Sequence, residues 1–167
     1  EKKKMWLGIE VEEIKFHKIT EDNKIRNGMR SICVHSHGIV NSETTSSIII
    51  ACHHGRRIIW ITSSPYPCVS LYKPLFLIKN NVNNLFTDIN ESLSYDKTNM
   101  EISYRLLENY LLFVKKIKPL RDEMEQTFHN IICSNLNKKG EQELCDDCKK
   151  CFNLEKEYID NISAIIS

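Results

Sequence analysis

A β-rich stretch is followed by a helical stretch in this chain, and that order limits the folds available to it. Residues 31–76 form the stretch richest in β-branched side chains, and they predict three short strands, at residues 31–35, 44–52 and 57–62. The second strand contains the unbroken apolar run of residues 48–51, which is typical of a strand covered on both faces. Residues 53–56 include a glycine, so we expect them to be a four-residue link in an antiparallel hairpin.

The second half of the chain has the periodicity of α-helices. Residues 97–118 place apolar side chains at three- and four-residue steps, and Pro119 is expected to stop or kink this helix. A second helix is expected over residues 120–136, ended by Gly140, and a third over residues 141–166. The side chains expected in the core are Met100, Ser103, Leu107, Tyr110, Leu111, Val114 and Ile117 in the first helix, Met124, Phe128, Ile131 and Ile132 in the second, and Leu144, Phe152, Tyr158, Ile162 and Ile166 in the third.

This order of elements predicts one domain of the α+β class, with an antiparallel sheet and packed C-terminal helices. The β-rich part covers residues 1–78, a connecting loop covers residues 79–96, and the helical part covers residues 97–167. A chain of 167 residues is long enough for one sizeable core.

Charge and cysteine content exclude some classes of partner. A net charge of +1 gives no field that would favour nucleic acid, and no apolar stretch approaches the roughly 20 residues of a membrane span. Seven cysteines, an odd number without a signal-peptide pattern, favour reduced thiols and a cytoplasmic location. Because the chain begins with Glu1 rather than Met, we expect it to be a piece of a longer protein.

A proline-containing segment follows the predicted hairpin. Pro65 and Pro67 cannot continue a central strand, because proline lacks the backbone donor that a ladder needs. A rigid turn at the end of a buried hairpin is well placed to present groups to a ligand. A tight turn of purely structural role explains the same residues, and it is the interpretation we favour.

Three cysteines near the C-terminus have a spacing that could bind a metal. Cys145, Cys148 and Cys151 are separated by gaps of two residues, and Cys133 or His129 could complete a set of four ligands for zinc or an iron–sulfur cluster. Against this, the chain has no second pair of closely spaced cysteines. The same spacing also places three small apolar side chains on one stripe of a helix, which is the interpretation we favour.

Other candidate groups have simpler structural explanations. His35 and His37 share one face of a strand and could bind one metal, but no third ligand has a convincing spacing. Cys68 has no neighbouring base or helix N-terminus that would activate it as a nucleophile, so we interpret it as a packed thiol near a turn. A solvated turn, rather than a phosphate site, is expected at the basic group formed by His53, His54, Arg56 and Arg57.

Several separated sequence blocks carry a resemblance to a known family. They are SICVH (31–35), SETTSS (42–47), WITSS (60–64), PCVSLYKP (67–74) and RDEMEQTF (121–128). In this order they resemble the C-terminal half of the secernin and cysteine-type dipeptidase family, over roughly residues 30–128. The departures from the family pattern are Glu43 for Gln, Ser46 for Gly, Ile48 for Met, Ser63 for Gly, and Ser94-Tyr95 for a pair of tryptophans.

The resemblance implies an αββα sandwich of the N-terminal-nucleophile hydrolase type. In that family an N-terminal cysteine attacks an amide carbonyl, and its own α-amino group serves as the base. This chain contains neither that cysteine nor the block around it, and Cys33 lies inside a predicted strand and cannot replace it. The chain would therefore supply no catalytic residue, metal ligand or cofactor site of its own.

What the resemblance does imply for this chain is part of a substrate pocket and one obligatory partner. The pocket candidates are His35, Thr44, Thr45, Trp60 and Ser64. The expected partners are the N-terminal half of the same protein and a dipeptide or small amide substrate, without nucleic acid or a membrane span. Two alternatives are a non-catalytic secernin-like protein that acts in secretion through protein binding, and a thiol–metal module at Cys145, Cys148 and Cys151.

Overall fold

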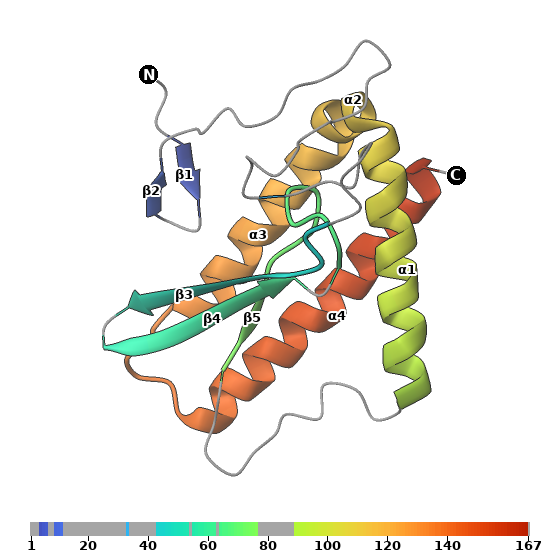
Figure 1. The fold of residues 1–167 in the computed structure, drawn as a ribbon. Coiled ribbons are helices and arrows are strands. Elements are labelled where there is room, and N and C mark those ends of the chain that lie inside the picture. The colour runs from blue at the N-terminus through green and yellow to red at the C-terminus, as the bar shows by residue number, and fades with distance from the viewer. Residues whose placement is uncertain are drawn as a thin grey trace.

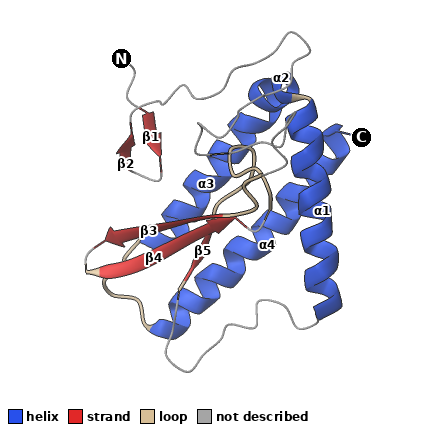
Figure 2. Ribbon diagram, in the orientation of Figure 1, coloured by secondary structure: helices blue, strands red, loops and turns tan. Residues whose placement is uncertain are grey.

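A computed structural model describes residues 4–6, 9–11, 33, 43–53, 55–62, 64–76 and 89–166 of the chain. An antiparallel sheet packs against helices from the C-terminal half, as Figures 1 and 2 show. The predicted α+β class is therefore confirmed. The first predicted strand, at residues 31–35, lies outside the described residues except for Cys33.

The main sheet has three antiparallel strands in the order β3-β4-β5. These strands are β3 (Ser47–His53), β4 (Arg56–Thr62) and β5 (Lys73–Leu75). Ile49 pairs with Trp60, and Ile59 pairs with Leu75. A separate antiparallel pair is formed by β1 (Lys4–Trp6) and β2 (Ile9–Val11).

The hairpin between β3 and β4 is tighter than the predicted four-residue link. His53 pairs with Arg56, so the turn between the strands has two residues and ends in Gly55. Gly55 has φ = +77°, the left-handed conformation that two-residue hairpin turns require and that glycine adopts without a steric penalty. The ladder thus extends by one residue on each side of the predicted link.

Replacing Gly55 with Ala is expected to lower the free energy of unfolding by about 1 kcal/mol. A Cβ at this position would meet no atom within 4 Å, so the loss comes from the backbone conformation and not from a clash. Asn tolerates positive φ better than Ala, so Gly55→Asn should lose less. Urea denaturation of the three proteins measures the order, and equal losses for Ala and Asn would contradict this explanation.

β3 is covered on one face only, which corrects the prediction of a strand buried on both faces. Ile48 and Ile50 are 66% and 62% exposed. Ile49 and Ala51, on the opposite face, pack against the core, as do the buried side chains Ile58 and Trp60 of β4. The consecutive apolar residues of β3 therefore alternate, as in an ordinary strand, between the core face and an outer face that carries the exposed isoleucines.

The helical half begins earlier, and turns earlier, than predicted. Its elements are α1 (Ile89–Glu108), α2 (Tyr110–Leu112), the π-helical segment η1 (Phe113–Ile117), α3 (Lys118–Cys133) and α4 (Glu141–Ile166). α1 starts inside residues 79–96, which were predicted to be a loop. The chain turns at Asn109, whose φ and ψ of −121° and 62° are not helical and whose side chain accepts a bond from Leu112 N. Pro119 instead lies in the first turn of α3, directly after the π-helical segment η1, so the chain stays helical on both sides of it.

The buried face of α1 differs by one position from the predicted stripe. Met100 and Val114 are exposed, whereas the buried side chains of α1 are Asn99, Ile102, Ser103 and Leu106. Ser103 belongs to the predicted stripe and is buried, whereas Asn99, Ile102 and Leu106 each lie one position before a residue of that stripe. The break at Asn109 also separates α1 from η1, and the two segments do not share one continuous stripe.

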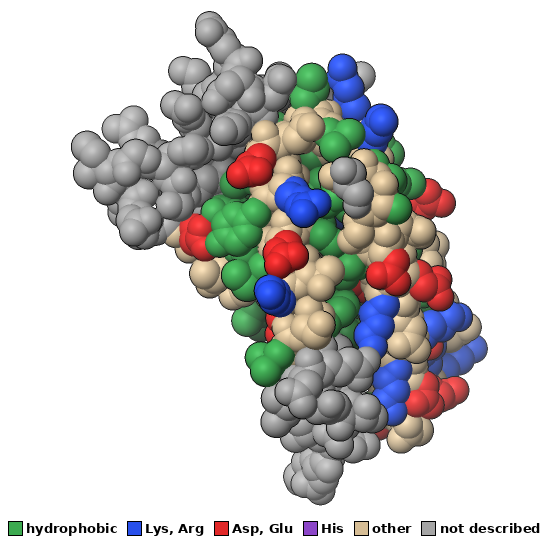
Figure 3. Space-filling view, turned by 90° about the vertical axis from the view of Figure 1, so that its right-hand side faces the viewer, with side chains coloured by type: hydrophobic (Ala, Val, Ile, Leu, Met, Phe, Trp, Pro, Cys, Tyr) green, Lys and Arg blue, Asp and Glu red, His purple; other side chains and the backbone are tan. Residues whose placement is uncertain are grey.

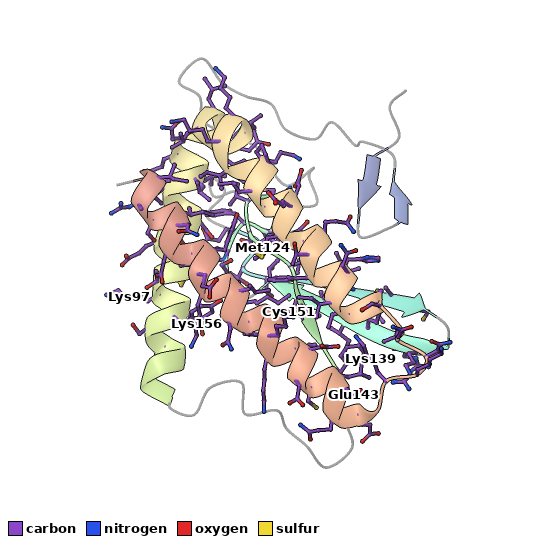
Figure 4. All side chains as sticks on the ribbon, turned by 180° about the vertical axis from the view of Figure 1, so that it is seen from behind. Lys97, Met124, Lys139, Glu143, Cys151 and Lys156 are labelled. Atoms are coloured by element: carbon purple, nitrogen blue, oxygen red, sulfur yellow. The ribbon has the colours of Figure 1, made fainter. Side chains whose placement is uncertain are left out.

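α3 packs as predicted but ends earlier. Phe128 and Ile132 are fully buried, and Met124 packs against the same core (Figure 4). The helix ends at Cys133 and not at residue 136, because Asn135 turns the chain with φ = +54° and Leu136 folds back into the core.

α4 has the predicted bounds, and Gly140 precedes it instead of ending α3. Gly140 N donates to Glu143 Oε2 at 2.8 Å, half of a capping box at the start of the helix. Figure 4 shows Lys139 and Glu143 at this end of α4. Arg56 Nη2 donates to Lys139 O at 2.8 Å, which joins the hairpin to the start of α4. The α4 side chains predicted in the core, Leu144, Phe152, Tyr158 and Ile162, are buried, and Ile166 is partly buried.

The surface that carries α1 has mixed charge. Figure 3 shows Lys and Arg side chains interspersed with Asp and Glu on this side of the molecule. Among the described helices, none is long and apolar enough to cross a membrane.

Candidate functional site

The segment between β4 and β5, residues 64–72, is buried and internally bonded, and we call it the 64–72 loop. Ser64 Oγ donates to Ser70 Oγ at 2.7 Å. Ser70 Oγ lies 3.1 Å from both Pro65 O and Tyr66 O. Tyr66, Val69 and Leu71 are buried as well. The predicted proline turn is therefore a rigid element of the core and not a solvated connection.

Two side chains of α3 hold this loop in place. Arg121 Nη1 donates to Cys68 O at 2.8 Å, and Glu125 Oε1 accepts from Tyr72 N at 3.2 Å. Arg121 also pairs with Asp122 at 2.8 Å and lies over the Phe113 ring at 5.3 Å. The RDEMEQTF block at residues 121–128 thus clamps the loop to the helical layer.

A carboxylate at the edge of the loop is held by two tyrosines. Tyr66 Oη donates to Glu43 Oε2 at 2.5 Å, and Tyr104 Oη donates to Glu43 Oε1 at 2.9 Å. The two rings meet edge to face with centroids 5.3 Å apart. Burial, together with the bond to the Glu43 carboxylate, raises the pKa of Tyr66, so its phenol stays a donor. Over the described ranges, Glu43 has no ion pair with Lys or Arg.

Tyr66 itself has a conformation that is rare outside glycine. Its φ is +61°, in the left-handed region, and its N–H donates to Thr44 O at 2.9 Å. Such a conformation in a bulky residue is held by its surroundings and is found preferentially at functional sites. Here it directs the phenol to Glu43.

A buried ion pair lies between the sheet and α4. Lys73 Nζ and Glu155 Oε2 are 3.1 Å apart, and each side chain is 3% exposed. The rings of Tyr95 and Phe152 each have their centroid 5.2 Å from the same ammonium. Burial raises the pKa of Glu155, and the contacts with Lys73 and Tyr95 oppose that shift.

A small cavity adjoins this pair beneath the 64–72 loop. Its volume is about 20 Å³, which suits one water molecule and excludes a dipeptide. Its polar lining comprises Ser64, Ser70, Asn99, Ser103, Glu155 and Tyr158. Asn99 Nδ2 is buried there, and among the described residues it has no hydrogen-bond partner. A hollow of about 200 Å³ near the C-terminal end of α4 is lined by Thr98, Glu101, Ile102, Arg105, Ser163 and Ile166.

The predicted pocket residues are only partly brought together. Thr44 and Ser64 are both linked to Tyr66: Thr44 O accepts from Tyr66 N, and Ser64 Oγ donates to Ser70 Oγ, which donates to Tyr66 O. Thr45 is exposed, and Trp60 is 1% exposed in the core, where its ring packs against other side chains. His35, like His37, lies outside the described residues.

The groups that sequence reasoning missed as site residues are Glu43 and the two tyrosines that hold it. The one available signal was the departure of Glu43 from the glutamine of the family pattern, which places a charge at this position. Tyr104 lies 61 positions away along the chain, and nothing in its local sequence pointed to Glu43.

The C-terminal cysteines pack as apolar side chains. Cys145, Cys148 and Cys151 are buried on α4, and Figure 4 shows Cys151 there. Burial raises the pKa of Cys148 to about 12, which disfavours the thiolate that metals bind. Within the described part of the chain, no group of three or more His, Cys, Asp or Glu side chains could hold a metal ion.

Cys68 is a half-buried thiol beside the core, and its nearest sulfur belongs to Cys33. Cys33 Sγ lies 3.5 Å from Cys68 Sγ. The hydrogen bond with the Cys33 thiol and burial raise the pKa of Cys68. This agrees with the interpretation of Cys68 as a packed thiol rather than a nucleophile.

Comparison of this chain with protein-family models, with curated proteins and with solved structures found no match in any of the three.

Proposed function

We propose that this chain is the C-terminal part of a cysteine-type dipeptidase or amidohydrolase similar to the secernins, and that its nucleophilic cysteine lies outside the chain. The ordered sequence blocks support the family, and one structural observation supports the architecture. Helices α3 and α4 cover one face of the sheet, while Ile48 and Ile50 on the other face are exposed. In an αββα sandwich a second sheet would cover this face.

The free energy available at that face is considerable. Burying an isoleucine side chain completely contributes roughly 1.5–3 kcal/mol, so covering two that are about two-thirds exposed would contribute roughly 2–4 kcal/mol. Ile59 and Ile61 of β4 pair with Ile50 and Ile48 and are half-buried, so they extend the same outer face. We propose that the N-terminal half of the same protein is the partner that covers it.

In the proposed enzyme the cysteine thiol attacks the substrate carbonyl and its α-amino group takes the proton. That proton then goes to the departing amine, and water hydrolyses the acyl-enzyme. This chain would contribute the pocket wall around Thr44 and Ser64. The Glu43 carboxylate, which is held by two neutral phenols, gives the wall a group that can bind the ammonium of a dipeptide.

The test is hydrolysis of dipeptides by the complete gene product. We expect cleavage of dipeptides with a free amino terminus and much slower cleavage of their N-acetylated forms. Glu43→Gln, which keeps one of the two acceptor oxygens and removes the charge, should raise KM for free dipeptides about tenfold. Glu123→Gln, an exposed position on α3, is the matched control.

A folded complete protein that hydrolyses neither form would contradict the proposed function and leave the binding alternative. Hydrolysis that Glu43→Gln does not affect would contradict only the role of Glu43.

A further inference from the structure

Two cysteines from distant parts of the sequence meet at the 64–72 loop. Cys33 and Cys68 are separated by 35 positions, and their sulfur atoms are 3.5 Å apart. A disulfide has its sulfurs about 2 Å apart, so bond formation requires an approach of roughly 1.5 Å. Movement of this size is within the range of small side-chain adjustments.

We propose that Cys33 and Cys68 form a reversible disulfide when the protein meets a small oxidising disulfide such as oxidised glutathione. This modification site is independent of the dipeptidase proposal. It uses neither Glu43 nor any residue placed in the pocket wall.

The reaction consists of two thiol–disulfide exchanges. The Cys33 thiolate attacks one sulfur of the glutathione disulfide, forms a mixed disulfide and releases one glutathione thiolate. The Cys68 thiolate then attacks the Cys33 sulfur and releases the second glutathione. The two protein thiols lose two electrons and two protons, and one disulfide is reduced to two thiols.

The environment of the two sulfurs sets this order. The hydrogen bond with the Cys33 thiol and burial raise the pKa of Cys68, so Cys68 reacts slowly with an external oxidant. Cys68 O is also held by Arg121 Nη1 at 2.8 Å, which fixes its backbone beside α3. Once Cys33 carries the mixed disulfide, its sulfur lies next to Cys68, and proximity compensates for the low thiolate fraction.

A disulfide here would connect the segment that contains Cys33 to the clamped 64–72 loop. Cross-linking residues 35 positions apart restricts the unfolded chain, and we expect the melting temperature to rise by roughly 5–10 °C. Addition of a reducing agent should reverse the shift.

The test is oxidation of the folded protein with excess oxidised glutathione. Intact-mass measurement should show a loss of about 2 Da, and peptide mapping should locate the cross-link between Cys33 and Cys68. Cys33→Ser should abolish the mass loss and the stabilisation. Cys52→Ser, which removes an exposed cysteine of β3, should leave both unchanged.

Cys68→Ser places a hydroxyl beside the core and could lower stability by itself, so Cys33→Ser is the deciding variant. Glutathione adducts at Cys52 without a cross-link, or a cross-link between any other two cysteines, would overturn the proposal.

Discussion

Lys73→Met is expected to lower the free energy of unfolding by about 3–5 kcal/mol, the largest loss among the substitutions considered for this protein. Lys73 and Glu155 are both almost completely buried and form an ion pair at 3.1 Å. Removing the ammonium leaves a buried carboxylate without its cation. The rings of Tyr95 and Phe152, which now lie around the ammonium, cannot replace that interaction.

The double variant Lys73→Met/Glu155→Leu distinguishes the effect of an unpaired buried charge from the effect of altered side-chain packing. Replacing both charges with apolar side chains of similar volume removes the need to desolvate either of them. We therefore expect the double variant to recover most of the loss and to come within about 1 kcal/mol of the wild type. Guanidinium denaturation of the three proteins measures the order. A double variant as unstable as Lys73→Met would contradict the assignment of the loss to an unpaired charge.

The loss in Lys73→Met should also depend on pH. Burial already raises the pKa of Glu155, and removing Lys73 takes away an interaction that lowers it. A folded-state pKa above the unfolded value of about 4.3 gives stability that is present at lower pH and is lost as pH rises through the folded pKa. The difference between variant and wild type should therefore be small near pH 4 and largest above pH 7. A difference that does not change with pH would contradict this explanation.

Arg121→Met is expected to lower the free energy of unfolding by about 2–4 kcal/mol, because it removes the clamp on the 64–72 loop. Arg121 donates to Cys68 O and to Asp122, and its side chain is mostly buried. Without the guanidinium, the Cys68 carbonyl loses its donor in a partly buried position. Tyr72 N would keep its hydrogen bond to Glu125, but the 64–72 loop around it would be less rigid.

Lys118→Met is the matched control for this prediction. Lys118 pairs with the same Asp122 carboxylate from one turn earlier in α3, but its side chain is more exposed than that of Arg121. Its replacement should lower stability by less than about 1 kcal/mol. Hydrogen exchange should show faster exchange at Val69 and Tyr72 in Arg121→Met and unchanged exchange in β4. Equal losses for the two variants would contradict the clamp.

Much of the architecture could be predicted because its signals are local. The bounds of α4 follow from a strong helical period that begins directly after Gly140. The pairing of β3 with β4 follows from two β-branched runs on either side of Gly55. These features depend on residues close together in the sequence, and tertiary contacts only reinforce them.

What could not be predicted depends on contacts between distant residues. The buried position Asn99 is polar, so apolar periodicity could not place it in the core, and the exposed Met100 beside it was predicted there instead. The run of isoleucines in β3 could not indicate which face the helices would cover. Asn109 ends α1, whereas Pro119 lies within a continuous helical run, directly after the π-helical segment η1.

The candidate site was less predictable than the fold. The resemblance directed attention to Thr44 and Ser64, which do lie near Tyr66, but also to Trp60, which is a core residue. The convergence of Glu43, Tyr66 and Tyr104 requires β3, the 64–72 loop and α1 to be in position first. The spacing of residues in the sequence does not indicate that these three side chains contact one another.

The most direct test of the proposed function is to locate the reactive nucleophile of the complete gene product. A dipeptidyl chloromethyl ketone alkylates a catalytic cysteine, and mass spectrometry of the digested protein identifies the modified residue. The proposal predicts one stoichiometric label, on an N-terminal cysteine outside the 167 residues described by this sequence. Labelling of any of the seven cysteines within this chain, or no labelling of a folded complete protein, would contradict it.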